Sequence, residues 1–81
     1  MDLKEKIRNF VIIELADNGI PDGLDDNESL IDSGILDSLN ILNLISFFDE
    51  NFNIIPSEDE LYPDNFDTIN LIHKYIEEKL G

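Results

Sequence analysis

The stretch DSGILDSL, residues 32–39, leads directly into an amphipathic run that ends at Phe52. Within this stretch, Ser38 stands where a loop is predicted to turn into a helix. Serine is typical at such a position, because its hydroxyl accepts hydrogen bonds from the free backbone N–H groups of the first helical turn. Asp37 adds negative charge beside the positive end of the helix dipole. We therefore expect Ser38 to be an exposed N-cap whose oxygen another macromolecule can reach.

The helix that follows is predicted to begin at Ser38 and to end at about Asn51. Its apolar positions recur with helical spacing and predict a face against the core: Ile41, Leu44, Ile45, Phe48 and Phe52. The remaining positions are mostly polar: Leu39, Leu42, Asn43, Ser46, Asp49 and Glu50. Because Leu39 and Leu42 lie near Ser38 on this polar face, we interpret them as an apolar contact patch for a partner. The alternative is that the preceding loop half-buries Leu42.

Two further helices are predicted, one before and one after this helix in the sequence. Asp2 and Glu5 have the spacing of a capping box, and the first helix should continue to about Asp17 and end at Asn18-Gly19. Its apolar face is formed by Leu3, Ile7, Phe10, Val11 and Leu15, and is widened by Ile12 and Ile13. Either Asp67 or Thr68 is expected to cap the last helix. The apolar stripe of the last helix is Ile69, Ile72, Ile76 and Leu80, with Tyr75 alongside.

The connections between these helices differ in length. Residues 20–37 read as a long loop, which in a compact domain is commonly functional or anchored by its own side chains. The expected anchors are Leu24, Leu30, Ile31, Ile35 and Leu36, and a disordered linker is the alternative. Residues 57–60 and Pro63 predict short helical turns before the last helix. The fold class predicted is all-α: a four-helix bundle of three main helices and one short helix, with a long first loop, in a single domain of residues 1–81.

Composition restricts the possible partners. The formal charge of −14 arises from 19 acidic and 5 basic residues, so neither nucleic acid nor an anionic membrane is an expected partner. Basic protein surfaces are favoured instead, with association steered by charge. The chain has no cysteine, no signal-peptide pattern and no apolar run of about 18 residues. We expect a cytoplasmic monomer.

Catalytic and metal sites find no support in the sequence. A serine hydrolase needs a base and a Gly-x-Ser-x-Gly turn, but His73 is the only histidine and no such turn surrounds Ser38. An EF-hand that began at Asp25 would have Leu30 at the required glycine and Leu36 at the required glutamate. The sequence therefore indicates neither a serine hydrolase nor an EF-hand, and we predict no dedicated metal site.

The segment SLIDSGILDSL, residues 29–39, resembles the acyl carrier protein family, which includes the peptidyl and D-alanyl carrier proteins. The resemblance covers nearly the whole chain, from about Leu3 to Leu80. It implies an acyl-carrier-like fold and a non-catalytic role. In this family, the serine of the Asp-Ser-Leu motif carries a 4′-phosphopantetheine group taken from coenzyme A. The resemblance therefore assigns the covalent attachment to Ser38, with Asp37 and Leu39 beside it.

The same resemblance implies that partner enzymes contact the central helix. Leu39, Leu42 and Ser46 match positions that touch partners, and Asn43 lies on the same face. Three acidic residues match positions that pair with basic side chains: Asp37, Asp49 and Glu50. The implied partners are a phosphopantetheinyl transferase and acyl-loading and acyl-processing enzymes with basic docking patches, in fatty-acid, polyketide, nonribosomal peptide or related biosynthesis.

The chain departs from the family pattern at two places. Asn40 and Asn43 stand where fatty-acid carriers usually have acidic residues, which favours a dedicated carrier for a specialised pathway. Phe47 and Phe48 could fill the crevice that long acyl chains enter in the fatty-acid carriers, so that the cargo is short or held outside. The alternative is that both rings belong only to the core.

A second class of protein, a small helical adaptor, would have the same length, acidic charge and helical pattern. A small acidic helical adaptor would use Ser38 only as an N-cap, and Ser38→Ala would then lower stability by about 1 kcal/mol and leave function intact. The same change would abolish the function of a carrier. The capped start at Asp2 and the absence of linker-like ends favour a free-standing carrier.

Overall fold

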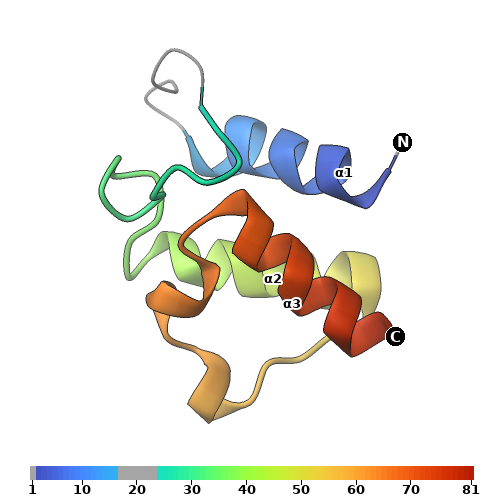
Figure 1. The fold of residues 1–81 in the computed structure, drawn as a ribbon. Coiled ribbons are helices and arrows are strands. Elements are labelled where there is room, and N and C mark those ends of the chain that lie inside the picture. The colour runs from blue at the N-terminus through green and yellow to red at the C-terminus, as the bar shows by residue number, and fades with distance from the viewer. Residues whose placement is uncertain (1, 17–23) are drawn as a thin grey trace.

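The computed structural model describes residues 2–16 and 24–81, and these residues form helices and loops without any strand. Figure 1 shows three α-helices, with two short helical turns between the second and the third. In chain order the elements are α1 (Leu3–Phe10), the π-helical η1 (Val11–Leu15), α2 (Asn40–Phe52), the 3-10 turns η2 (Glu58–Glu60) and η3 (Pro63–Phe66), and α3 (Ile69–Leu80). The predicted end of the first helix at Asp17–Gly19 lies outside the described residues.

The first helix changes its winding halfway. Asp2 caps α1 as predicted, because its Oδ1 accepts a hydrogen bond from Glu5 N at 2.8 Å. From Val11 the helix widens, and Ala16 N donates to the carbonyl of Val11 five residues earlier, at 2.9 Å. Residues 11–13 are all β-branched and crowd a regular α-helix, which favours the looser turn. Ile13 is 69% exposed, so the expectation that it widens the core face is wrong.

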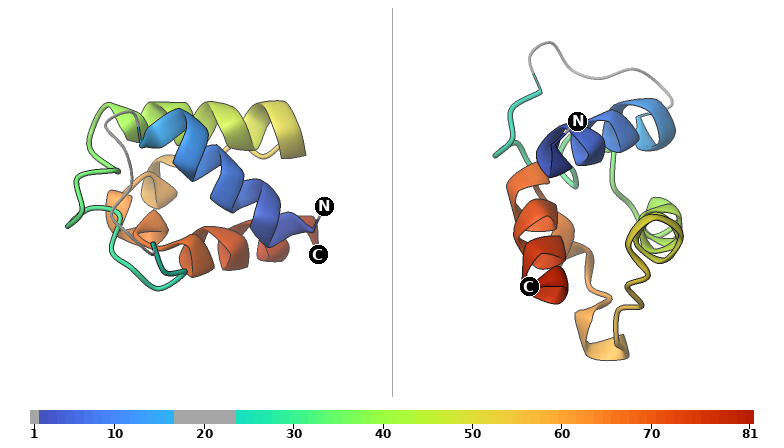
Figure 2. Two further views of the ribbon diagram at one scale, coloured as in Figure 1. Left: turned by 90° about the horizontal axis from the view of Figure 1, so that it is seen from above. Right: turned by 90° about the vertical axis from the view of Figure 1, so that its right-hand side faces the viewer.

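The two halves of this first helix differ in their main contacts. α1 packs mainly on α3 and η1 packs on α2, and Phe10 at the end of α1 also stacks on Phe47 of α2. Figure 2 shows the same arrangement: the start of α1 crosses α3, and the end of the helix lies beside α2. The side chains that form these contacts include Ile7, Val11 and Leu15, all of them buried. The π-helical segment therefore lies where the first helix meets α2.

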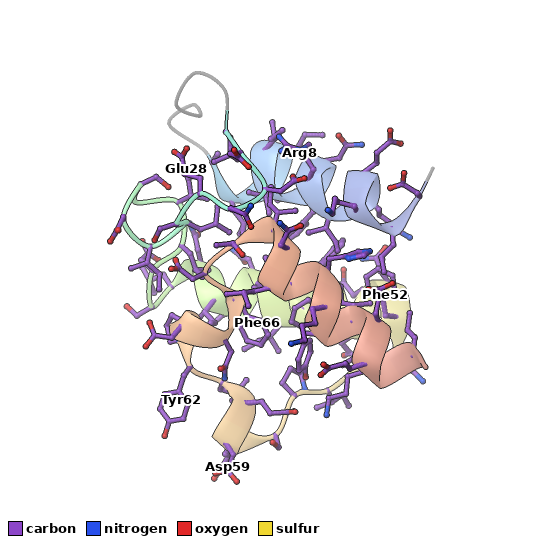
Figure 3. The ribbon with its side chains drawn as sticks, in the orientation of Figure 1. Arg8, Glu28, Phe52, Asp59, Tyr62 and Phe66 are labelled. Carbon is purple, nitrogen blue, oxygen red and sulfur yellow. The ribbon has the colours of Figure 1, made fainter. Side chains whose placement is uncertain are left out.

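Apolar side chains from all three α-helices, from η1 and η3 and from the long loop form the core. Phe48 is fully buried, and the centroid of its ring lies 5.4 Å from that of Phe66 and 5.3 Å from that of Tyr75. Figure 3 labels Phe66 near the centre of the molecule. The predicted stripe of α3 is confirmed at three positions, Ile69, Ile72 and Ile76. Leu80 is 57% exposed, contrary to prediction, because it lies at the last turn of the helix.

The short fourth helix of the prediction is two separate 3-10 turns. Ser57 and Glu60 form a reciprocal capping box around η2, and Pro63 begins η3. A residue before proline is disfavoured in the helical conformation, and Tyr62 accordingly has an extended backbone with φ −89° and ψ 131°. Pro63 therefore prevents the two turns from joining into one helix.

Lys79 and Tyr75 of α3 hold η2 in place. Lys79 Nζ lies 2.8 Å from Glu60 Oε2, and the hydroxyl of Tyr75 donates to Glu60 Oε1 at 3.2 Å. Hydrogen bonds from Lys79 and from the backbone N–H of Ser57 lower the pKa of Glu60 to about 2. Burial, and then the charge of Glu60, raise the pKa of Tyr75 to about 12. Glu60 is therefore ionised at neutral pH and joins η2 to the last helix.

The long loop is anchored to the helices, at least over its described part. Four of the five expected anchors are buried and Ile31 is half-buried, so the disordered linker is wrong for residues 24–37. The main polar anchor is Asp67, whose Oδ1 accepts from Ser29 Oγ at 2.7 Å and from Ile31 N at 3.0 Å. Its carbonyl accepts from Leu30 N at 2.6 Å. Because the carboxylate of Asp67 binds the loop, Thr68 and not Asp67 caps α3. The hydroxyl of Thr68 accepts a hydrogen bond from Leu71 N at 3.0 Å.

A second set of contacts joins the loop to α1 at Asp26. Arg8 donates to Asp26 Oδ1 at 2.6 Å, and Lys4 Nζ lies 3.6 Å from Asp26 Oδ2. The hydrogen bond from Arg8 lowers the pKa of the Asp26 carboxyl. Figure 3 shows Arg8 on the side of α1 that faces the loop. The loop is thus tied to the first helix and to the last.

Asp67→Ala should weaken the attachment of the loop to the residues that precede α3, while the hydrogen bond from Asn70 N to the carbonyl of Asp26 at 3.1 Å remains. The substitution removes the acceptor for Ser29 Oγ and Ile31 N, and we expect it to lower the free energy of unfolding by about 2–3 kcal/mol. Urea unfolding followed by circular dichroism measures this loss. The matched control is Asp64→Ala, an exposed aspartate in the neighbouring turn η3, which should change stability by less than about 0.5 kcal/mol. Equal losses in the two variants would contradict the anchoring role.

Candidate functional site

Asp37, and not Ser38, caps α2. The carboxylate Oδ1 of Asp37 accepts from Leu39 N at 2.9 Å and from Asn40 N at 2.8 Å. Its carbonyl accepts from Ile41 N at 3.0 Å, which begins the helical hydrogen-bond pattern. A charged carboxylate at this place also interacts favourably with the helix dipole. The prediction that Ser38 is the N-cap is therefore wrong, and the regular helix begins at Asn40.

Ser38 lies in the turn between its cap and the helix. The residue is exposed, and its Oγ makes no hydrogen bond to any other described residue. Its neighbours are also exposed, and Leu39 is 74% accessible to solvent. The hydroxyl is thus presented to solvent from a turn that other groups hold in place.

The polar face of α2 lies as predicted. Leu42 is 60% exposed, so the alternative that the loop half-buries it is wrong. The other predicted contact residues of this face are exposed as well: Asn43, Ser46, Asp49 and Glu50. Together with Leu39, they form a face with two exposed leucines near Ser38 and two carboxylates near the far end. The structure therefore places every predicted partner-contact residue at the surface.

Asn40 has a structural role that sequence reasoning missed. Its side-chain Nδ2 donates to the carbonyl of Ile35 at 2.7 Å and to that of Leu15 at 3.3 Å. It thereby joins the loop and the end of η1 to the first turn of α2. An ionised carboxylate has no donor for these carbonyls. An amide at this position is therefore explained by the two hydrogen bonds that it donates. No local pattern in the sequence indicates this role.

Asn40→Asp tests this role. The variant loses both donated hydrogen bonds and places a carboxylate against two carbonyl oxygens, so we expect a loss of about 1–3 kcal/mol in the free energy of unfolding. Asn43→Asp is the control, because it adds the same charge to the same helix at an exposed position and loses only an exposed hydrogen bond of 3.4 Å to Asn40 Oδ1. Chemical denaturation should show less than about 0.5 kcal/mol of change there. A similar loss in both variants would mean that charge alone is responsible.

An open groove of about 620 Å³ lies between the first helix and α2, and we name it the α1–α2 groove. The first helix lines it with Asn9, Phe10, Ile13 and Glu14. The wall from α2 is formed by Asn43, Ser46, Phe47, Glu50 and Asn51. The rings of Phe10 and Phe47 are stacked, with centroids 4.1 Å apart. Sequence reasoning found three residues of the α2 wall but none of the opposite wall.

No helix in the described part of the chain is long and apolar enough to cross a membrane.

Comparison with known proteins assigns no family to this chain. A scan against models of protein families found no match, and a search of the curated proteins found none either. Arguments about function therefore depend on the residues of this chain and on their geometry.

Proposed function

We propose that this protein is an acyl carrier protein with an acyl-carrier-like helical fold, to which 4′-phosphopantetheine is attached at Ser38. The observation that carries the proposal is the hydroxyl of Ser38, which is exposed and makes no hydrogen bond to the other described residues. Because Asp37 provides the cap, an adaptor would have no structural need for a serine at this position. A carrier needs the serine hydroxyl as the attachment point.

The residues around Ser38 fit the group. Ser38 Oγ is accessible, and the hydrogen bonds of Asp37 hold the turn without using that oxygen. In the attachment, Ser38 Oγ forms a bond to the phosphorus next to pantetheine in coenzyme A, its proton is released, and adenosine 3′,5′-bisphosphate leaves. A phosphopantetheinyl transferase with a divalent cation catalyses this step. The attached group supplies a terminal thiol that holds an acyl or aminoacyl cargo as a thioester.

The exposed face of α2 serves as the docking surface in this proposal. Leu39 and Leu42 offer apolar contact beside the attachment point, and Asp49 and Glu50 attract basic patches on the loading and processing enzymes. Surface charge of this kind speeds association more than it slows release. A carrier that must pass between several enzymes needs such contacts.

The core residues of α2 suggest a small cargo. Phe48 is fully buried against Phe66 and Tyr75, and its ring occupies the space between α2 and the C-terminal elements. The ring of Phe47, whose centroid lies 6.3 Å from that of Phe48, packs against Phe10. We infer that the cargo is short or lies outside the core, as in a carrier dedicated to a specialised pathway.

Intact mass measurement tests the proposal. Purified protein that is folded and unmodified is incubated with coenzyme A, magnesium and a broad-specificity phosphopantetheinyl transferase. We expect a gain of one phosphopantetheine, which fragmentation of the peptides should locate on Ser38. No gain with a transferase that loads a known carrier in parallel would reject the proposal and favour the adaptor.

A further inference from the structure

The α1–α2 groove is large enough to hold a small molecule. Its volume of about 620 Å³ falls in the range of ligand pockets. The stacked rings of Phe10 and Phe47 and the exposed side chain of Ile13 provide apolar surface. Polar side chains from both helices surround these groups. A short carbon chain with a polar end fits this combination.

The groove lies within reach of a group attached at Ser38. Along a helix, Ser46 lies about 12 Å beyond Ser38 and Glu50 about 18 Å, at about 1.5 Å per residue. Extended phosphopantetheine has about 14 bonds between the serine oxygen and the thiol sulfur, which corresponds to about 16 Å at the length per bond of an extended peptide chain. The thiol end of the arm therefore reaches the part of α2 that lines the groove.

The charge of the groove distinguishes between kinds of cargo. Its two ionisable lining residues are Glu14 on the first helix and Glu50 on α2, and no described lysine, arginine or histidine lines it. Carboxylates on both walls attract an ammonium group and repel a carboxylate. The groove therefore favours a cationic cargo over an anionic one.

We propose that the α1–α2 groove holds the cargo carried at Ser38 and that Glu14 and Glu50 make it selective for small aminoacyl groups with a free ammonium. This inference rests on the carrier function proposed above and specifies its cargo. The apolar floor of Phe10, Ile13 and Phe47 contacts the carbon chain, and the two carboxylates face the amine. The cargo thus stays on the surface of the bundle, outside the core between α2 and α3.

The test compares three cargoes of similar size on the same ¹⁵N-labelled protein. Coenzyme A analogues with a stable amide in place of the thioester attach a β-alanyl, a malonyl or a butanoyl group. Intact mass confirms complete attachment before any spectrum is recorded, so failure of the carrier proposal shows as absent loading. In the loaded proteins, we expect the backbone amides of Ile13, Glu14 and Phe47 to shift about twofold to fivefold more with β-alanyl than with malonyl, the range of a surface ion pair. Butanoyl should fall between them, and about 0.5 M salt should reduce the difference.

Charge variants connect the selectivity with the two glutamates. Glu14→Gln/Glu50→Gln should make the shifts with β-alanyl and malonyl equal and leave those with butanoyl unchanged. The matched control Glu58→Gln/Asp59→Asn removes two charges from η2, which lies at the opposite end of the molecule from α1 (Figure 3), and should preserve the selectivity. Shifts confined to the neighbours of Ser38 or to α3 would overturn the groove as the cargo site. Equal shifts with all three cargoes in the unmutated protein would overturn the selectivity.

Discussion

Ser38→Ala should abolish attachment of phosphopantetheine and leave the fold unchanged. The substitution removes the only oxygen that the proposal assigns to the reaction. Ser38 is exposed and makes no hydrogen bond to the other described residues, so the free energy of unfolding should change by less than about 0.5 kcal/mol. Intact mass after treatment with coenzyme A and transferase measures attachment, and urea unfolding measures stability.

The control for this variant is a second exposed serine, Ser46, which lies on α2 itself. Ser46→Ala keeps the hydroxyl of Ser38 and should still gain one phosphopantetheine at the end of the reaction. Attachment to Ser38→Ala would show that another residue is modified. A stability loss of about 1 kcal/mol in Ser38→Ala would restore the serine as the cap and contradict the role of Asp37.

Phe48→Ala should cause the largest loss of stability. The ring is fully buried and contacts the rings of Phe66 and Tyr75, so its removal leaves a cavity among groups from three elements. Such truncations cost about 3–5 kcal/mol. Because small domains have total stabilities of about 5–15 kcal/mol, we expect a marginally folded or unfolded protein. Thermal and urea unfolding followed by circular dichroism measure the change.

The matched control is an exposed aromatic residue. Tyr62 is 64% exposed and points away from the core in Figure 3, so Tyr62→Ala should change stability by less than about 0.5 kcal/mol. A loss below about 1 kcal/mol in Phe48→Ala would mean that the neighbouring rings close the cavity, and would contradict the central place of Phe48 in the core.

The sequence predicts the helices better than it predicts their ends. Apolar residues with helical spacing indicate that three helices exist, and this signal depends only on local periodicity. At the start of α2, Asp37 and Ser38 are adjacent and both are favoured as caps, so the pattern does not choose between them. The choice follows from the turn that brings the loop to the helix, where Asp37 Oδ1 reaches the N–H groups of Leu39 and Asn40.

For a related reason, the sequence predicts only the part of the candidate site that lies at Ser38 and on α2. Ser38 and the polar face of α2 follow from one motif and one helix. The opposite wall of the α1–α2 groove depends on how the first helix crosses α2 and on the π-helical winding of η1. Neither the crossing of the two helices nor the winding of η1 can be inferred from periodicity within a single segment. Contacts between distant residues, such as Asn40 with Leu15, set this geometry.

The anchoring of the loop by Asp26 and Asp67 has a consequence for the entropy of docking. Fixing the backbone of one flexible residue costs about 1–2 kcal/mol of conformational free energy. For residues 24–37 this cost is met when the protein folds, because their hydrogen bonds to α1 and α3 are part of the folded state. A partner that approaches Ser38 therefore meets a preordered surface. A small contact area is then sufficient for recognition, and release remains fast.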